Sequence, residues 1–243
     1  MTTYPYVVER DVAGVPVQLS IDDVSAELWY DEPGRANGQL AIAELIFAHN
    51  LGLIEMGGNM LDVGAHHGVM ALHFAHWAEH VIAIEAGADS AETLRRNIAL
   101  NDAANVTVVH ALAGSTASMA RFEPVTAFAS PFGDEEVEEL PLDRWADLEP
   151  RFVKIDVEGY EYDVLVGAAE ILEGAPNLLI EIHSEFSLAR FGHSYLDAIS
   201  LVDWDRYDVW CHRPGRTAPL EEWGPGMPLD ESPVSWLFAR AKS

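Results

Sequence analysis

The chain has 243 residues, 49% of them hydrophobic and 22% charged, which is typical of one large globular α/β domain and excludes a disordered chain. Its 40 acidic and 14 basic side chains give a net charge of −26, and only Lys154 and Lys242 are lysines, so a nucleic-acid partner is not expected. The single cysteine, Cys211, excludes a disulfide within the chain. With no signal-like leader and no apolar run long enough to span a membrane, the sequence predicts a cytoplasmic protein without a membrane partner.

The N-terminal part predicts an extension that precedes the main domain. Residues 1–37 have the pattern of a hairpin, and Gln39–Asn50 that of a helix leading into the core. We therefore expect an N-terminal extension over residues 1–55 and a core over residues 56–243.

Short apolar runs alternate with helical patterns throughout the core, which is typical of βαβ units. The expected strands are Met60–Val63, Val81–Glu85, Val106–His110, Phe152–Val157, Leu178–His183, Tyr207–Cys211 and Val234–Ala239, the last two as an antiparallel pair. The expected helices are Gly68–Trp77, Ala91–Leu100, Tyr160–Leu172 and Tyr195–Leu201. The fold class is thus α/β, with a doubly wound, mostly parallel, seven-stranded sheet of the Rossmann-like kind.

Residues 114–150 interrupt this alternation. The stretch contains Pro124, Pro131 and Pro141 and the acidic run Asp134–Glu139. We expect loops with one or two short strands, inserted on the side where a substrate would bind, and an acidic run that faces solvent.

The run Leu61–Gly68 joins the first core strand to the helix that follows it. Gly64 and Gly68 let the backbone turn tightly and let a ligand approach it. A dinucleotide site would need a further glycine two positions after Gly64, which this loop lacks, and Ala65 follows Gly64 directly. The spacing therefore suits a cofactor without a pyrophosphate.

An acidic residue, Glu85, ends the second core strand. Its carboxylate can accept hydrogen bonds from both hydroxyls of an adenosyl ribose. Asp62 either orders the loop or reaches an ammonium group of the ligand, and the segment after the third core strand is where an adenine edge would lie. The expected cofactor-binding residues are Asp62, Gly64, Ala65, His66, Gly68, Glu85, Ala86, Ala111, Leu112 and Asp156.

Several of these motifs together resemble the FkbM-type methyltransferases. They are Leu61–Gly68, Ile82–Glu85, Leu94–Asn97, Lys154–Glu161 and Ile180–His183, and the Lys-Ile-Asp-Val-Glu-Gly-x-Glu run is the most specific. The resemblance spans Met60 to His183 and implies a class I methyltransferase fold, S-adenosylmethionine as cofactor, and O-methylation of sugars or secondary metabolites. The family's loop commonly reads Gly-Ala-Asn, whereas His66 stands at the Asn position here.

Candidate chemistry lies at the carboxyl ends of the fourth and fifth core strands, where ligands of such sheets bind. Asp156 and His183 are the catalytic candidates, and together with Glu181 they could hold a divalent cation such as Mg²⁺. His183 is equally compatible with a hydrogen-bonded core histidine. The other charged residues and histidines nearby have structural interpretations. Glu158 and Glu161 are interpreted as charges at a helix N-terminus, and His66 and His67 as loop residues that line the cofactor. His73, His76 and His80 are expected at surface or helix-edge positions.

The sequence therefore predicts an S-adenosylmethionine-dependent O-methyltransferase acting on a hydroxyl of a small molecule. Three alternatives stay open. They are a catalytically silent protein that binds the cofactor or acts as a scaffold, an N-methyltransferase and, more distantly, a nicotinamide oxidoreductase.

Overall fold

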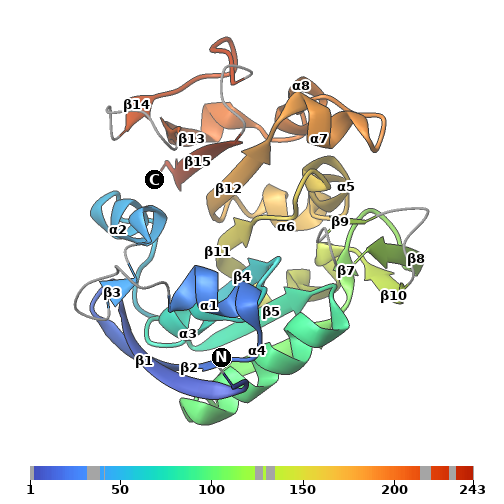
Figure 1. Cartoon of the computed structure of the whole chain (residues 1–243). Helices are drawn as coiled ribbons and strands as arrows, with labels where there is room; N and C mark the ends of the chain where they lie inside the picture. The colour runs from blue at the N-terminus through green and yellow to red at the C-terminus, as the bar shows by residue number, and fades with distance from the viewer. Residues whose placement is uncertain are drawn as a thin grey trace.

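The computed structural model describes residues 3–31, 39–40, 42–123, 128–129, 135–213, 220–229 and 234–242. An eight-stranded sheet lies at its centre (Figure 1). In spatial order its strands are β14 (Glu221–Glu222), β13 (Tyr207–His212), β15 (Val234–Ala241), β12 (Asn177–His183), β11 (Pro150–Ile155), β4 (Asn59–Val63), β5 (His80–Glu85) and β6 (Val106–His110). The strands from β12 to β6 are parallel, whereas β15 is antiparallel to both β12 and β13. The doubly wound, mostly parallel sheet is confirmed, and β14 adds a two-residue edge strand.

Helices cover both faces of this sheet. Their bounds are α1 (Val24–Tyr30), α2 (Ala43–Asn50), α3 (Val69–Phe74), α4 (Ala88–Leu100), α5 (Glu161–Val166), α6 (Ala169–Glu173), α7 (Glu185–Ala189) and α8 (Tyr195–Ile199), with 3₁₀ helices at Leu142–Leu148 and Trp204–Arg206. Side chains alternate along a strand, so Met60 packs with α2, α3 and α4 in one core while Leu61 packs with α5, α6 and α8 in the other. Among the described helices, none combines the length and the apolar character needed to cross a lipid bilayer.

The order of the parallel strands determines where a ligand can bind. The chain runs outward from β4 through β5 to β6 and then crosses to β11 and β12 on the other side of β4. A crevice therefore opens at the carboxyl ends of β4 and β11, where the winding direction reverses.

The N-terminal hairpin consists of β1 (Tyr6–Val12) and β2 (Val15–Ile21), with β3 (Gln39–Leu40) parallel to β1. It curves around α3 and α4, and its apolar side chains enter the same core as theirs (Figure 1). Helix α1 directly follows β2, inside the stretch where only a hairpin was expected, and residues 32–37 of that stretch lie outside the described residues.

Residues 112–140 contain more strand than the expected loops with one or two short strands. They contain a second sheet in the order β7-β10-β8-β9, formed by β7 (Leu112–Ala113), β8 (Ser118–Glu123), β9 (Phe128–Ala129) and β10 (Glu135–Leu140). Most of the acidic run belongs to strand β10, in which alternate side chains face inward and Val137 packs with Phe122. Glu139 is buried rather than solvated, because its carboxylate accepts hydrogen bonds from the Ser115 N–H (2.9 Å) and the Ser118 hydroxyl (3.0 Å).

The single helix expected over Tyr160–Leu172 is broken into α5 and α6. The break lies at Gly167, where a Cβ atom would be only 2.0 Å from the carbonyl oxygen of Gly114. The chain that leaves β7 therefore passes so close to this point that only glycine fits.

The expectation of a surface position for His73 is wrong, since its side chain is fully buried between the hairpin and α2. Its Nδ1–H donates to the carbonyl oxygen of Val12 (3.0 Å), and its Nε2 lies 2.6 Å from Nε2 of His49. Burial lowers the pKa of His73 to about 4. This histidine is thus a neutral polar link between the N-terminal hairpin and the main domain.

We expect this link to make the fold sensitive to acid. The unfolded chain takes up a proton on His73 below its ordinary pKa whereas the folded chain does not, so stability is retained above about pH 6.5 and lost as the pH falls toward 4. Between about pH 7.5 and pH 5, the free energy of unfolding measured with urea should fall by about 2 kcal/mol more in the wild type than in His73→Gln. The exposed His76 provides the control His76→Gln, which should match the wild type. Equal pH dependence in His73→Gln and wild type would contradict this assignment.

Candidate active site

A cleft of about 1450 Å³ opens at the carboxyl ends of β4, β5, β11 and β12. Its wall also includes residues of α1 and β15, so segments distant in the sequence meet there. Small-molecule sites typically occupy roughly 300–1,000 Å³, so this cleft has room for a cofactor and an acceptor together.

The loop after β4 forms one wall of the cleft. The N–H groups of Gly64 and Ala65 both donate to the carbonyl oxygen of Ile84 (3.0 Å each), which holds the loop against β5. Gly64 has a φ of +73°, and a Cβ atom there would lie 1.7 Å from the carbonyl oxygen of Asp156. The glycine is therefore required both by the turn and by the close approach of β11.

His66 in this loop has a left-handed backbone, with a φ of +50°. Asparagine, aspartate and histidine adopt this conformation more readily than most residues, which explains how histidine can replace the commoner asparagine here. The His66 ring stacks on that of His67 at 3.9 Å between centroids. Burial and the neighbouring His67 lower the pKa of His66 to about 3, so its imidazole is neutral.

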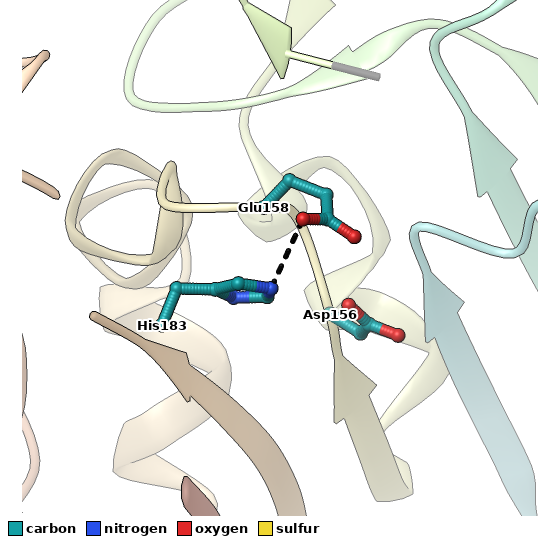
Figure 2. A group of neighbouring side chains, drawn as sticks. All are labelled: Asp156, Glu158 and His183. Carbon is teal, nitrogen blue, oxygen red and sulfur yellow. Dashed lines mark ion pairs between the residues drawn. The ribbon is translucent and has the colours of Figure 1, made fainter. Parts of the chain in front are cut away.

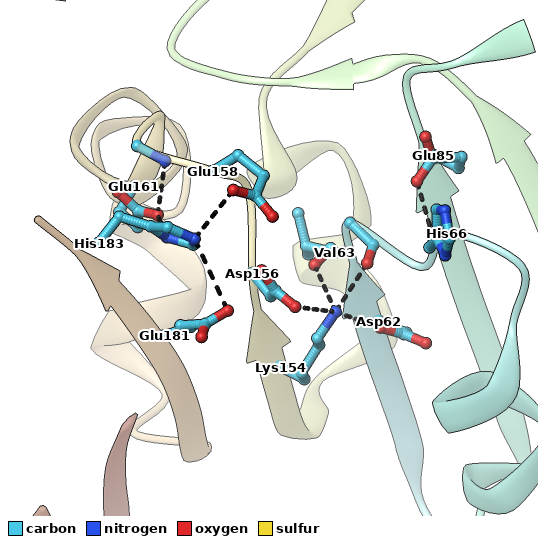
Figure 3. A network of polar contacts seen from close by, with 12 residues as sticks. Asp62, Val63, His66, Glu85, Lys154, Asp156, Glu158, Glu161, Glu181 and His183 are labelled. Carbon is cyan, nitrogen blue, oxygen red and sulfur yellow. Dashed lines mark hydrogen bonds and ion pairs between the residues drawn. The ribbon is translucent and has the colours of Figure 1, made fainter. Parts of the chain in front are cut away.

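Glu85 faces this loop from the end of β5 (Figure 3). One carboxylate oxygen accepts from the His66 N–H and the other from the Gly87 N–H, both at 2.8 Å. Burial raises the pKa of Glu85, and these two hydrogen bonds oppose that effect. Each oxygen keeps a lone pair, so the carboxylate can still accept two hydroxyl groups of a ligand.

Apolar residues continue the wall beyond Glu85. Ala86, Ala111 and Leu112, which were expected here, line the cleft together with Phe122 from β8. The sequence did not indicate Phe122, because it comes from the small sheet, where only loops with one or two short strands were expected. These apolar side chains suit contact with a base.

The buried Lys154 ties the centre of the site together (Figure 3). Its Nζ donates to the carbonyl oxygens of Val63 (3.2 Å) and Gly64 (2.7 Å), and it lies 3.2 Å from Asp62 and 3.6 Å from Asp156. Burial alone would lower the pKa of Lys154, but the two carboxylates outweigh burial and raise it. The ammonium group in turn holds the pKa of Asp156 below its usual value against the effect of burial. The sequence analysis placed Lys154 in the family motif but gave it no role in the site, because a single lysine in an apolar strand carries no spacing signal.

His183 lies among three acidic side chains at the end of β12 (Figure 3), and Figure 2 shows it beside one of them, Glu158. Its Nδ1 is 2.7 Å from Glu161, and its Nε2 is 3.2 Å from Glu158 and 3.8 Å from Glu181. Burial would lower the pKa of His183, but hydrogen bonds to Glu158 and Glu161 raise it to about 11. Burial and the nearby Asp156 raise the pKa of Glu181 to about 10. The imidazole is therefore a cation, and Glu181 holds a proton next to the ionised Asp156.

Three of these residues offer ligand atoms that all lie within 4.8 Å of one another, namely Asp156, Glu158 and His183. The sequence grouped Asp156 and His183 with Glu181 instead. Glu158 was interpreted as a helix N-terminal charge, but it lies in the turn after β11 with a φ of +56°, and its carboxylate is 3.2 Å from Nε2 of His183. A signal for this turn was present in the Gly159 that follows.

All ten expected cofactor residues belong to the described part of the chain, and eight of them line the cleft. The two that do not are Asp62 and Gly68. Asp62 is fully buried behind the wall, where its carboxylate pairs with Lys154. This burial favours a role in ordering the loop over a contact with the ligand. The wall also contains a buried polar atom, Nδ1 of His67, with no hydrogen-bond partner among the described residues. The free acceptors of Glu85, the apolar wall and this unsatisfied nitrogen fit an adenosyl cofactor.

Residues 62–205 match the family model described as the methyltransferase FkbM domain. No curated protein matches the chain in sequence.

Solved structures of methyltransferases have a similar fold. An FkbM methyltransferase from Methylobacillus flagellatus KT is 23% identical with a TM-score of 0.48, and the match covers 77% of this chain but only 45% of that one. An rRNA methylase from Streptococcus thermophilus is 11% identical with a TM-score of 0.51, and the match covers 82% of this chain and 97% of that one. A precorrin-6y C5,15-methyltransferase from Geobacter metallireducens GS-15 is 16% identical with a TM-score of 0.49, over 88% of this chain and 93% of that one. At such identities the likeness concerns the fold alone.

We expect Glu85 to be required for binding of an adenosyl cofactor. Glu85→Ala should weaken S-adenosylhomocysteine binding by about 2–4 kcal/mol, because two charge-assisted hydrogen bonds are lost. Glu85→Gln should weaken binding less, since its amide keeps one acceptor oxygen. Titration calorimetry provides the measurement, with Glu92→Ala, an exposed acidic residue of the same cleft, as the control. Wild-type affinity in Glu85→Ala would remove Glu85 from the binding site.

Proposed function

Because this chain belongs to the FkbM methyltransferase family, we propose that it transfers a methyl group from S-adenosylmethionine to a hydroxyl of a small molecule, such as a sugar or a secondary metabolite. One observation carries the proposal. The charged group formed by Asp156, Glu158, Glu181 and His183 lines the same cleft as the loop after β4 and Glu85. Groups that bind a cofactor and groups that handle protons therefore face one space.

The bound cofactor supplies an activated methyl group, and the chain's own residues hold it and prepare the acceptor. In this proposal Gly64, Ala65 and His66 contact the amino-acid part of the cofactor, and Glu85 accepts from its ribose. Ala86, Ala111 and Leu112 contact the base. Asp62 and Gly68 support the loop from behind.

The acceptor oxygen must lose its proton as it attacks, and Asp156 is the base we propose. It is ionised, it lines the cleft, and Lys154 and the protonated Glu181 hold its carboxylate in place. His183 was the other candidate base, but an imidazole with its pKa raised to about 11 keeps its proton at neutral pH. We therefore propose that His183 positions Glu158 and Glu181 when no metal is bound.

The charge of the cleft favours a neutral or cationic acceptor. Nine acidic side chains of the described residues line it, the protonated Glu181 and those of Asp22, Asp23, Glu44, Glu85, Asp89, Glu92, Asp156 and Glu158. Lys154 and Arg96 are the cationic side chains of fixed charge on the described wall, and each pairs with an aspartate. Phosphate groups would be repelled, so we do not expect a nucleic-acid acceptor.

We expect the protein to methylate hydroxyl groups in a panel of sugars and phenols when S-adenosylmethionine is present. The measurement is a mass-spectrometric search for products heavier than their precursors by one CH₂ group, followed by identification of the methylated atom. Asp156→Asn should lower the rate by about 10²–10⁴-fold, the usual contribution of a general base. Methylation found only on nitrogen, or cofactor binding without any methylated product across the panel, would contradict O-methylation.

We also propose that a divalent cation, Mg²⁺ or a transition ion such as Mn²⁺, binds at Asp156, Glu158 and His183, with Glu181 beside it. Carboxylates are the ligands that Mg²⁺ prefers, whereas an imidazole suits Mn²⁺ or Zn²⁺ better. Glu161 accepts from Nδ1 of His183, and this arrangement orients Nε2 as histidines are oriented in metal sites. A cation there would favour loss of the acceptor's proton.

Metal binding should release protons, because the ligand atom Nε2 of His183 carries one in the metal-free protein. Calorimetric titration of Mn²⁺ in two buffers with different ionisation enthalpies, near neutral pH, should detect the release of about one proton per ion or more. Glu158→Gln should weaken binding, whereas Glu185→Gln on α7 should not. Turnover should cease in EDTA and return with Mg²⁺ or Mn²⁺. No binding heat together with full turnover in EDTA would contradict the metal site.

A further inference from the structure

Tyr30, the last residue of α1, reaches the cofactor loop from outside the segment that matches the family model. Its hydroxyl lies 2.7 Å from Nδ1 of His66, and its ring centroid lies 5.5 Å from that of His67. Tyr30 also lines the cleft. The N-terminal extension therefore contributes a polar group to the wall of the cofactor site.

Polar contacts from the hairpin hold Tyr30 in this position. The Arg10 Nε–H donates to the carbonyl oxygen of Tyr30 (2.8 Å), and the Arg10 guanidinium pairs with Asp31. The Tyr6 hydroxyl donates to the same Asp31 carboxylate (2.8 Å). Tyr6 and Arg10 both belong to β1, so the hairpin holds the end of α1 in place.

The contact between Tyr30 and His66 selects one form of the imidazole. A neutral imidazole carries one proton, on Nδ1 or on Nε2, and its other nitrogen is an acceptor. Burial and the nearby Glu85 raise the pKa of Tyr30, so its hydroxyl keeps its proton and needs an acceptor. Within the described part of the chain, Nδ1 of His66 is the one hydrogen-bond partner of that hydroxyl. Tyr30 therefore donates, and the proton of His66 resides on Nε2.

This arrangement leaves the Nε2–H of His66 as a donor in a cleft whose described wall contains nine acidic side chains. No described residue bonds Nε2 of His66, whereas Lys154 and Arg96 are already paired with aspartates. S-adenosylmethionine carries a carboxylate on its amino-acid part, and this group needs a donor among the acidic side chains of the wall. A neutral N–H supplies one without the cost of desolvating a further charge.

We propose that Tyr30 fixes the Nε2–H form of His66 and that this N–H donates to the carboxylate of the cofactor's amino-acid part. Tyr30 is thus a positioning residue that acts through His66. The inference rests on the proposed cofactor, but not on the acceptor, the metal or the base.

The proposal is tested first by ligand selectivity. Tyr30→Phe removes only the hydroxyl, so binding of S-adenosylhomocysteine should weaken about tenfold, as expected for one hydrogen bond to a charged group. Binding of 5′-methylthioadenosine, which has the adenosyl part but no carboxylate, should be unchanged. In a His66→Asn background Tyr30→Phe should have no further effect, because the two residues act as a pair. Tyr207→Phe, which removes a buried hydroxyl far from the cleft, is the matched control for stability.

A second measurement examines the imidazole directly, without any ligand. A ¹H–¹⁵N spectrum of the histidine side chains should show His66, identified by its absence in His66→Asn, as the Nε2–H form in the wild type. Tyr30→Phe should show a mixture of both neutral forms. Equal weakening of both ligands, unchanged affinity for both, or an Nδ1–H form in the wild type would each overturn the proposal. If Glu85→Ala also left S-adenosylhomocysteine binding unchanged, the proposed cofactor itself would be wrong.

Discussion

The site depends on one buried cation. The ammonium group of Lys154 bonds two carbonyl oxygens at the end of β4 and lies between Asp62 and Asp156, so it joins the two strands between which the winding of the sheet reverses. Burial raises the pKa of Asp62 and the ammonium group opposes that effect, whereas it holds the pKa of Asp156 below its usual value. The cofactor loop starts directly after β4, and the proposed base ends β11. A single charge thus sets the relative position of the two halves of the active site, and the proposed chemistry depends on that position.

Parallel topology explains why much of the site could be predicted from sequence. Apolar runs identify the central strands, and the carboxyl ends of such strands meet at one edge of the sheet. Gly64, Glu85, Asp156 and His183 could therefore be expected in one cleft although they are far apart in the chain. The spacing of the loop alone was compatible with several ligands that lack a pyrophosphate. The resemblance of Lys154–Glu161 to the family motif indicated S-adenosylmethionine as the cofactor.

The remainder could not be predicted, because it depends on tertiary contacts that leave no periodic pattern. Glu158 looks like a helix N-terminal charge, but it lies in the turn after β11 with a left-handed backbone, and its carboxylate is close to His183. The acidic composition of Glu135–Leu140 conceals a strand whose inward positions include a hydrogen-bonded glutamate. Tyr30 belongs to a seven-residue helix in a stretch where only a hairpin was expected, and its role comes from meeting a loop 36 positions away. Pairings of this kind are specified by the assembled fold rather than by neighbouring residues.

The position of β15 in the sheet imposes an order on folding. This strand pairs with both β12 and β13, although it follows both in the chain. Until it enters, the edges of β12 and β13 have unpaired backbone groups, and β12 is rich in apolar side chains. Such edges are templates for association with other chains. Substitutions that delay the entry of β15 should therefore act mainly through the folding pathway, lowering the yield of folded protein by aggregation even where the completed fold is hardly destabilised.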